Sequence, residues 1–408
     1  MSTHPSRPSY AAVLRVPHAR RTFTAALTAR LSYGTVSLAV LLSVTRATGS
    51  WAVSGLVLSL FGATTVLLMP LRAALIDAHG PRRALLPMSV LYGALLTVLA
   101  VLTWRPGAPA AAVAGAAALA GCCAPPLGPV MRALWSELVP DRALLQRAYS
   151  LDGVAEELLF VSGPAVVGGL MAFAPPAAGI LLSAALNTAG TCALVTSPAM
   201  TAPRPAARGE RQRRPARVRG LLPPVAVALG VGLALSSVEL LVMAFATERS
   251  YDPALVPWVL GALSAGSALG GLANGALRWR TTARARLYRF AAALGVTLAA
   301  AALAPTLWTL TGVMALAGAF VAPALTTAYL LADESATEAT RTRAGAWVNM
   351  AVNTGSSGGV AVMGLLIGRV PLEVCFLLAG SVAVLPAVVA RRTLRDAPAV
   401  LSGARRSA

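Results

Sequence analysis

Long apolar runs separated by short polar segments dominate the chain. Twelve windows each hold about 20 mostly apolar residues, the length that a helix needs to cross the hydrocarbon core of a bilayer. The windows lie near residues 22–44, 51–75, 84–104, 108–131, 148–172, 176–196, 221–246, 254–277, 287–304, 307–332, 344–367 and 372–391. This pattern predicts an all-α membrane protein with twelve transmembrane helices.

Composition supports the same class. Of the 408 residues, 57% are hydrophobic and 12% are charged, whereas a soluble domain has about 25% charged residues. The chain contains Arg but no Lys, so it cannot form a phosphate-binding loop of the GxxxxGK[ST] type. We therefore expect no ATPase domain of that class. Arg in place of Lys, with abundant Ala, indicates a GC-rich genome and hence a bacterial cytoplasmic membrane.

The arginines predict the orientation of the spans. With the N-terminus in the cytoplasm, 29 of the 34 arginines fall on cytoplasmic segments and four on external loops, and Arg30 lies within the first span. Cytoplasmic loops are enriched in Arg and Lys, so both termini are predicted to be cytoplasmic. Residues 1–21 and 392–408 are then cytoplasmic tails. The net charge of +19 reflects topology and contact with lipid headgroups, and we expect no nucleic acid partner.

An Arg-rich linker at residues 198–220 divides the spans six and six. It separates a predicted N-terminal bundle, 22–197, from a C-terminal bundle, 221–391. The halves also resemble each other: at an offset of 196, Arg147 corresponds to Arg343 and Gly163 to Gly359. Two parallel six-helix repeats are a transporter architecture, with the substrate site near the middle of the membrane.

The segment RAALIDAHGPRRALL, residues 72–86, carries a more specific signal. Asp77, Gly80, Arg82 and Arg83 fit the pattern GxLaDRxGRRxxL, and on this basis the chain resembles the major facilitator superfamily. The resemblance implies alternating access, with Asp77 holding the start of the eleventh span in one transport state. A carboxylate is stabilised at a helix N-terminus, here around Arg343.

A second motif of the resemblance lies in the fifth span. GPAVVGG, with Gly163, Pro164, Gly168 and Gly169, is similar to the Gly-Pro motif of exporters in this family. A glycine-rich run at 261–275 in the eighth span is expected to face it across the two halves. These small residues would let helices approach closely, and the motif favours export.

Family exporters that exchange a drug for a proton often carry an Arg in the fourth span. The fourth window here reads AAVAGAAALAGCCAPPLGP and holds no charge. We therefore expect that this part of their coupling mechanism is missing.

Three acids in the fifth span are the main candidates for chemistry. Asp152 and Glu156 are four residues apart and share a helix face, while Glu157 points elsewhere. Arg30 lies at a matching depth in the first span, and a buried charge requires a partner. Arg30 could pair with one acid structurally, one acid could carry a proton, or a free acid could bind a cationic substrate. In the repeat, Glu157 corresponds to the neutral Asn353, which favours a functional role.

Other polar residues within spans are weaker candidates. Glu239 in the seventh span either faces an outer vestibule or reaches the membrane interface. Four residues are expected to line the pore, although such groups often bond only to neighbouring helices. They are Asn349, Asn353, Asn274 and Tyr329.

These observations favour proton-coupled efflux of a small amphipathic or cationic organic compound. The alternatives are uptake of a small nutrient and a receptor that binds ligand without transport. The four cysteines and three histidines form no metal site or disulfide framework, and no nucleophile and base pair is visible. We therefore expect no enzyme activity and no cofactor beyond a proton gradient. Nothing in the sequence requires more than a monomer.

Overall fold

The computed structural model describes residues 9–139, 141–201, 218–277 and 279–395. Within these ranges the secondary structure is helical, apart from one isolated bridge between Ile367 and Val370. The first half contains α1 (Tyr10–Arg15), α2 (Ala19–Thr48), α3 (Trp51–Leu67), α4 (Met69–His79), α5 (Pro81–Leu102), α6 (Ala110–Cys123), α7 (Leu127–Leu138), α8 (Arg142–Met171), α9 (Ala177–Val195) and α10 (Pro198–Thr201). The second half contains α11 (Val218–Glu248), α12 (Val256–Ala276), α13 (Ala283–Ala300), α14 (Leu307–Ser335), α15 (Arg341–Leu366) and α16 (Leu372–Arg395).

Each of the twelve predicted windows coincides with a helix or a broken helix. Nine helices in the described ranges are long and apolar enough to cross a membrane, or ten if the bent pair α3 and α4 forms one span. The windows 344–367 and 372–391 fall on α15 and α16. The prediction of an all-α membrane protein is confirmed.

Side-chain caps fix several helix starts. The Asp141 carboxylate accepts the Leu144 N–H at 2.7 Å and so sets the beginning of α8. The Ser50 and Thr282 hydroxyls cap α3 and α13 in the same way. A cap of this kind satisfies one of the backbone donors that the first helical turn leaves unpaired. Because the cap fixes where α8 begins, it also fixes the height of the α8 acids within the bundle.

Two spans are interrupted. α3 and α4 meet at Leu68 with a bend of 41°, and α6 and α7 are separated by Ala124, Pro125 and Pro126. Proline lacks an N–H and cannot continue the hydrogen-bond ladder. The freed carbonyls are satisfied by Arg72, which donates to Gly121, to Cys122 and to Thr65. Arg72, assigned from the sequence to a cytoplasmic segment, is thus buried within the bundle.

The chain divides into two compact units. Of the described residues, the first comprises 9–139, 141–201, 268–277, 279 and 329–350, so one end of α12, α14 and α15 belongs with the N-terminal helices. The second comprises residues 218–267, 280–328 and 351–395.

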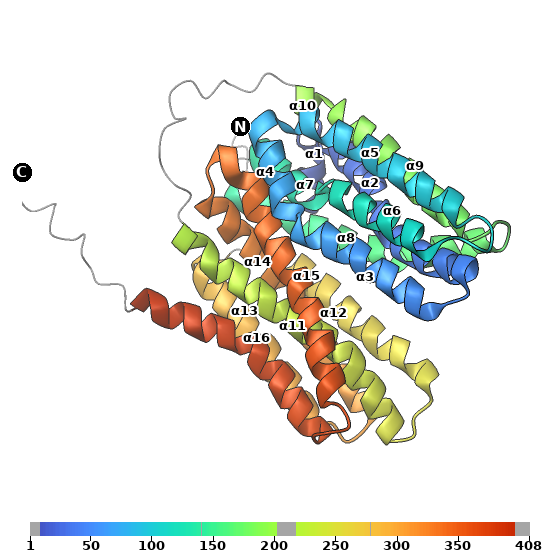
Figure 1. Ribbon diagram of the computed structural model, residues 1–408. Helices are drawn as coiled ribbons and strands as arrows, with labels where there is room; N and C mark the ends of the chain where they lie inside the picture. Colours follow the sequence, from blue (N-terminus) through green and yellow to red (C-terminus); the bar gives the residue numbers. More distant parts are fainter. Residues whose placement is uncertain (1–8, 140, 202–217, 278, 396–408) are drawn as a thin grey trace, which may run out of the picture. The chain divides into compact units, whose positions relative to one another are not determined.

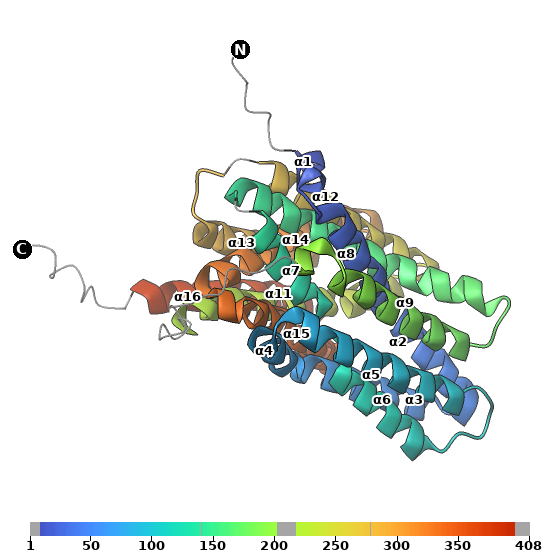
Figure 2. The same cartoon turned by 90° about the horizontal axis from the view of Figure 1, so that it is seen from above.

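In the first unit, α2 packs between α8 and α9, and α5 lies beside both α6 and α9 (Figures 1 and 2). A core of buried apolar side chains joins these helices, with Phe61, Tyr92, Leu96 and Ile180 among its larger members. α2 and α8 approach closely, because a Cβ on Gly163 would collide with the backbone of Gly34. This contact brings the charged residues of the two helices within reach of each other.

In the second unit, α16 packs against α11 and α13. Gly295 and Gly380 allow α13 and α16 to approach closely, because a Cβ on either would meet the other's backbone. Leu294, Leu298 and Phe376 are buried beside this contact. Glu239 lies on α11 in this unit and is exposed.

Candidate functional site

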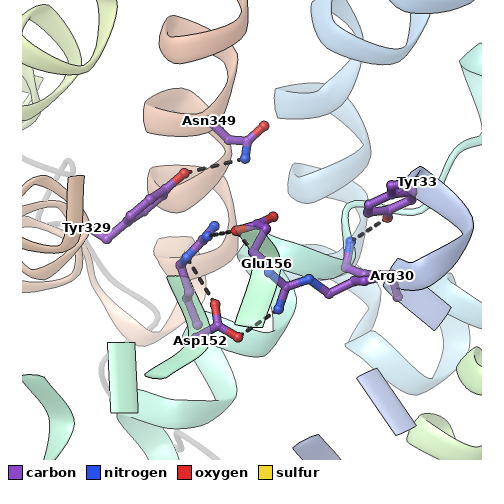
Figure 3. A network of polar contacts seen from close by, with 8 residues as sticks. Arg30, Tyr33, Asp152, Glu156, Tyr329 and Asn349 are labelled. Carbon is purple, nitrogen blue, oxygen red and sulfur yellow. Dashed lines mark hydrogen bonds and ion pairs between the residues drawn. The ribbon is translucent and has the colours of Figure 1, made fainter. Parts of the chain in front are cut away.

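A ring of four charged side chains lies inside the first unit (Figure 3). The Arg30 guanidinium on α2 contacts Asp152 Oδ1 at 2.7 Å and Glu156 Oε2 at 2.9 Å. Asp152 and Glu156 are one turn apart on α8, so their carboxylates project from one face, as predicted. Arg30 therefore pairs with both acids.

Arg132 on α7 closes the ring from the other side. Its Nε lies 3.4 Å from Asp152 Oδ2, and its Nη2 donates to Glu156 Oε2. Each acid is thus held between two guanidiniums, and Glu156 Oε2 is shared by both.

The expectation that the fourth span holds no charge is wrong. That span continues beyond its proline break into α7 and ends at Leu138, so Arg132 is part of it. The predicted window stopped at Met131, one residue short, and Arg132 was therefore assigned to a cytoplasmic segment. A helix that resumes after a proline break was the signal that could have revealed it.

Helices α14 and α15 supply a polar side to the ring. The Arg132 guanidinium lies over the face of the Tyr329 ring, 3.8 Å from its centroid. The Asn349 amide donates to the Tyr329 hydroxyl at 3.4 Å (Figure 3). On the other side, the Tyr149 hydroxyl donates to the backbone carbonyl of Arg132 at 3.1 Å. The hydrogen bond from Tyr149 therefore anchors the backbone of α7 at Arg132. The Arg132 side chain is held through the contacts of its guanidinium group.

Tyr33 marks the break between α6 and α7 beside the ring. Its hydroxyl donates to the Pro125 carbonyl and accepts the Leu127 N–H at 3.3 Å. The hydroxyl thus replaces a missing step of the helical ladder. Tyr33 was not among the residues predicted from the sequence, because an isolated tyrosine in an apolar run carries no pattern.

The ring is buried and balanced in charge. The side chains of Arg30, Arg132 and Asp152 are 1%, 7% and 0% exposed, whereas Glu156 is 20% exposed. Two cations face two anions, so the formal charges cancel. Removing one partner of a buried ion pair leaves an uncompensated charge, which is strongly destabilising. Glu156 is the most exposed member of the ring.

The remaining predicted residues fall in different places. Glu157 is half-buried on α8, and Glu239 and Asn353 are exposed in the second unit. Asn274 is buried near the end of α12, where its carbonyl accepts from Gln146. Of the predicted pore-lining residues, the structure brings Tyr329 and Asn349 to the ring.

The segment 72–86 makes the contact that the resemblance implies. The Asp77 carboxylate accepts the backbone N–H groups of Thr342 at 3.3 Å and of Arg343 at 3.0 Å. These groups belong to the first turn of α15, where the helix dipole stabilises a negative charge. Gly80 has φ +84° at the turn between α4 and α5, a conformation that favours glycine. Arg82 and Arg83 are exposed.

A second contact joins α8 to the end of α12. Arg147 Nη2 donates to the Ala276 carbonyl at 3.0 Å, beside the bond from Gln146 to Asn274. The Tyr10 hydroxyl of α1 donates to the Leu272 carbonyl. The Asn274 and Ala276 carbonyls belong to the last turn of α12, which leaves such groups without a partner inside the helix. α1 therefore takes part in the packing of α12.

The Gly-Pro motif of α8 has a local packing role. Gly163 is buried against Gly34 of α2, whereas Pro164, Gly168 and Gly169 are exposed. The motif therefore supports the α2 and α8 contact that assembles the ring. Its role in movement of the two halves stays a prediction.

Comparisons with known proteins identify the class. The model of the Major Facilitator Superfamily matches residues 22–309 and 240–407. Three solved structures each align with 92 to 93% of this chain and 99% of their own. A bacterial homologue of the iron transporter ferroportin has a TM-score of 0.71 at 16% identity. The human organic anion transporter MFSD10 has 0.70 at 16%, and the E. coli fucose:proton symporter has 0.69 at 13%.

The fold, the apolar helices and these matches define a multi-pass secondary transporter of the membrane, not an enzyme. The chain belongs to the Major Facilitator Superfamily. A comparison with curated protein sequences finds no significant match. The structural similarities, at 13 to 16% identity, establish the fold and leave the substrate open.

Proposed function

We propose that the protein exports a small amphipathic or cationic organic compound across a bacterial cytoplasmic membrane in exchange for protons. The observation that carries this proposal is the position of Glu156. Its carboxylate is shared by two buried guanidiniums, yet it remains the most exposed member of the ring. The Gly-Pro motif of α8 supports the export direction.

Glu156 can take up a proton only when its partners loosen. Its carboxylate contacts Arg30 of α2 and Arg132 of α7, which also contact Asp152 on its own helix. Tyr329 of α14 lies against the Arg132 guanidinium, and Tyr33 of α2 lies near Arg30 (Figure 3). The two guanidiniums favour the ionised carboxylate, because opposite charges stabilise it. Protonation of Glu156 therefore requires that Arg30 and Arg132 release it.

A substrate cation makes the same demand on the ring. The cation can bind Glu156 only while the side chain of Glu156 is an ionised carboxylate. It must also compete with the two guanidiniums for that carboxylate. A proton and a cation are therefore alternative partners of one group. Mutually exclusive binding of two ligands at one site is the thermodynamic requirement for their exchange across a membrane.

Asp77 is proposed to control the alternation between states. Its two bonds to the first turn of α15 exist only while α4 and α15 are in contact. The bonds of Arg147 and Gln146 to the end of α12 act on α8, the helix that carries the ring acids. Binding at the ring and opening at these contacts can thus influence each other through α8 and α15.

The test begins with cells that contain or lack the gene, exposed to a panel of toxic organic compounds. A compound to which the gene gives resistance is then followed in membrane vesicles with an imposed pH gradient. Transport is expected to require the gradient and to be lost in the Glu156→Gln, Glu157→Gln double variant. The single Glu156→Gln variant separates the two acids. Full transport without a gradient, or by the double variant, contradicts the coupling scheme.

The matched control is Glu373→Gln, which removes an exposed acid at the start of α16. It should transport at the native rate. The direction of flux separates export from nutrient uptake: an exchanger moves the compound opposite to the flow of protons, whereas an uptake symporter moves it with the protons. A receptor without transport would bind the compound and show no counterflow.

A further inference from the structure

The guanidinium of Arg132 occupies a position with the chemistry of an organic cation site. One face of the group lies 3.8 Å from the centroid of the Tyr329 ring. Its edge contacts the carboxylates of Asp152 and Glu156. An aromatic face together with carboxylates is the combination that binds organic cations in proteins, through cation–π and ionic attraction.

We propose that Arg132 is an internal occupant of the substrate site, and that a small organic cation binds between Tyr329 and Glu156 by displacing its guanidinium. The ligand class is a compact or planar cation such as an amidinium, a guanidinium or an aromatic amine. The inference rests on the proposed function, because it names the substrate class of the same site.

The Arg132 side chain is poorly satisfied for a buried guanidinium. Its Nη1 is buried and makes no hydrogen bond among the residues that the structure describes. A buried donor without a partner has lost its hydration without compensation, so this occupant is easier to displace than a fully bonded one. Arg30 also has a buried Nε without a hydrogen bond among the described residues, but it holds Asp152 at 2.7 Å, closer than Arg132 at 3.4 Å. Arg30 can compensate Asp152 while Arg132 moves.

Displacement keeps the site neutral. When a monovalent cation enters and the Arg132 guanidinium leaves, the site still holds two positive and two negative charges. The backbone of Arg132 stays fixed by the bond from Tyr149, so only a flexible side chain must move. An anionic ligand would add a third negative charge beside Asp152 and Glu156. Charge balance therefore favours a cation.

Two probes of nearly identical shape and opposite charge test the proposal. Benzamidinium and benzoate share a phenyl ring and a planar two-atom head. Their binding is measured by calorimetry on the purified protein in detergent, in native form and as Arg132→Gln. The variant leaves Arg30 against two carboxylates and vacates the position over Tyr329. We expect it to bind benzamidinium about tenfold more tightly than the native protein, and benzoate no better.

Three further variants serve as controls, one at an exposed ion pair and two at Tyr329. Arg142→Gln removes a guanidinium from an exposed pair with Glu334, whose side chains are 69% and 38% exposed, and should leave benzamidinium affinity unchanged. In the Arg132→Gln background, Tyr329→Phe keeps the aromatic face and the affinity. Tyr329→Leu removes the face and should lower the affinity about fivefold.

If Arg132→Gln does not fold, Arg132→Lys keeps the charge of the ring but loses the planar group that lies over Tyr329. A Lys ammonium makes a weaker contact with an aromatic face and with two carboxylates than Arg does, so this variant should also bind benzamidinium more tightly than the native protein. The proposal is overturned if the folded variant binds benzamidinium no more tightly. It is also overturned if native protein binds benzoate and the variant loses it, because Arg132 would then be an anion ligand. Binding is measured without a gradient, so failure of proton coupling does not affect this result.

Discussion

Asp152→Asn is the substitution whose effect the structure predicts most directly. The Asp152 side chain is fully buried and contacts Arg30 at 2.7 Å and Arg132 at 3.4 Å. Asparagine has nearly the same shape but no charge. The variant would therefore leave two buried guanidiniums facing only Glu156. A structural effect is expected even if transport is never measured.

The magnitude follows from burial. Removing one partner of a buried ion pair costs about 3–5 kcal/mol, because the remaining charge is uncompensated. Glu334→Gln removes an acid from an exposed pair with Arg142, and exposed pairs contribute about 0–1 kcal/mol. Adding Arg132→Gln to Asp152→Asn removes the excess positive charge. Contacting residues of this kind show coupling energies of about 0.5–3 kcal/mol, so the double variant should recover part of the loss.

The assay is equilibrium unfolding in mixed micelles with increasing SDS, followed by tryptophan fluorescence. The free energy of unfolding is compared among native protein, Asp152→Asn, Arg132→Gln, the double variant and the Glu334→Gln control. The reasoning is refuted if Asp152→Asn costs no more than Glu334→Gln. It is also refuted if the double variant is less stable than the sum of its two single changes.

Three other substitutions test contacts outside the ring. Asp77→Asn removes the charge at the first turn of α15, worth about 0.3–1 kcal/mol, and should shift spin-label distances between α4 and α15 toward separation; unchanged distances would contradict a holding role. Tyr10→Phe removes the hydroxyl bond to α12 and should lower stability by about 1 kcal/mol, seen as a lower melting temperature. Gly163→Val places a side chain against the backbone of Gly34 and should cost about 1–3 kcal/mol in the same melting assay. Gly168→Val, which faces open space, should cost nothing.

The fold was largely predictable because helices that span a membrane require long apolar runs, which are easily recognised in a sequence. Apolar runs of about twenty residues are typical of membrane-spanning helices and rare elsewhere, and each predicted window coincides with helical structure. The bounds were less accurate where a span continues after a break. The fourth window stopped at Met131, although the span resumes at Leu127 and extends to Leu138.

Both acids of the candidate site and one of its two arginines could be predicted from the sequence. Spacing on one helix placed Asp152 and Glu156 on a common face, and the need for a counter-ion selected Arg30. Arg132 was missed because its position depends on the proline break between α6 and α7, which no periodicity reveals. The stacking of Tyr329 on Arg132 could not be predicted either, since it joins residues nearly two hundred positions apart.

The central claim is that a proton and an organic cation are alternative partners of Glu156. The most direct measurement uses proteoliposomes loaded with the exported compound, without an imposed pH gradient, and an enclosed pH-sensitive dye. As the compound leaves down its own gradient, the native protein should move protons inward and acidify the lumen, and Glu156→Gln should not. Flux of the compound without any change in lumen pH, or equal acidification by Glu156→Gln, would contradict the account.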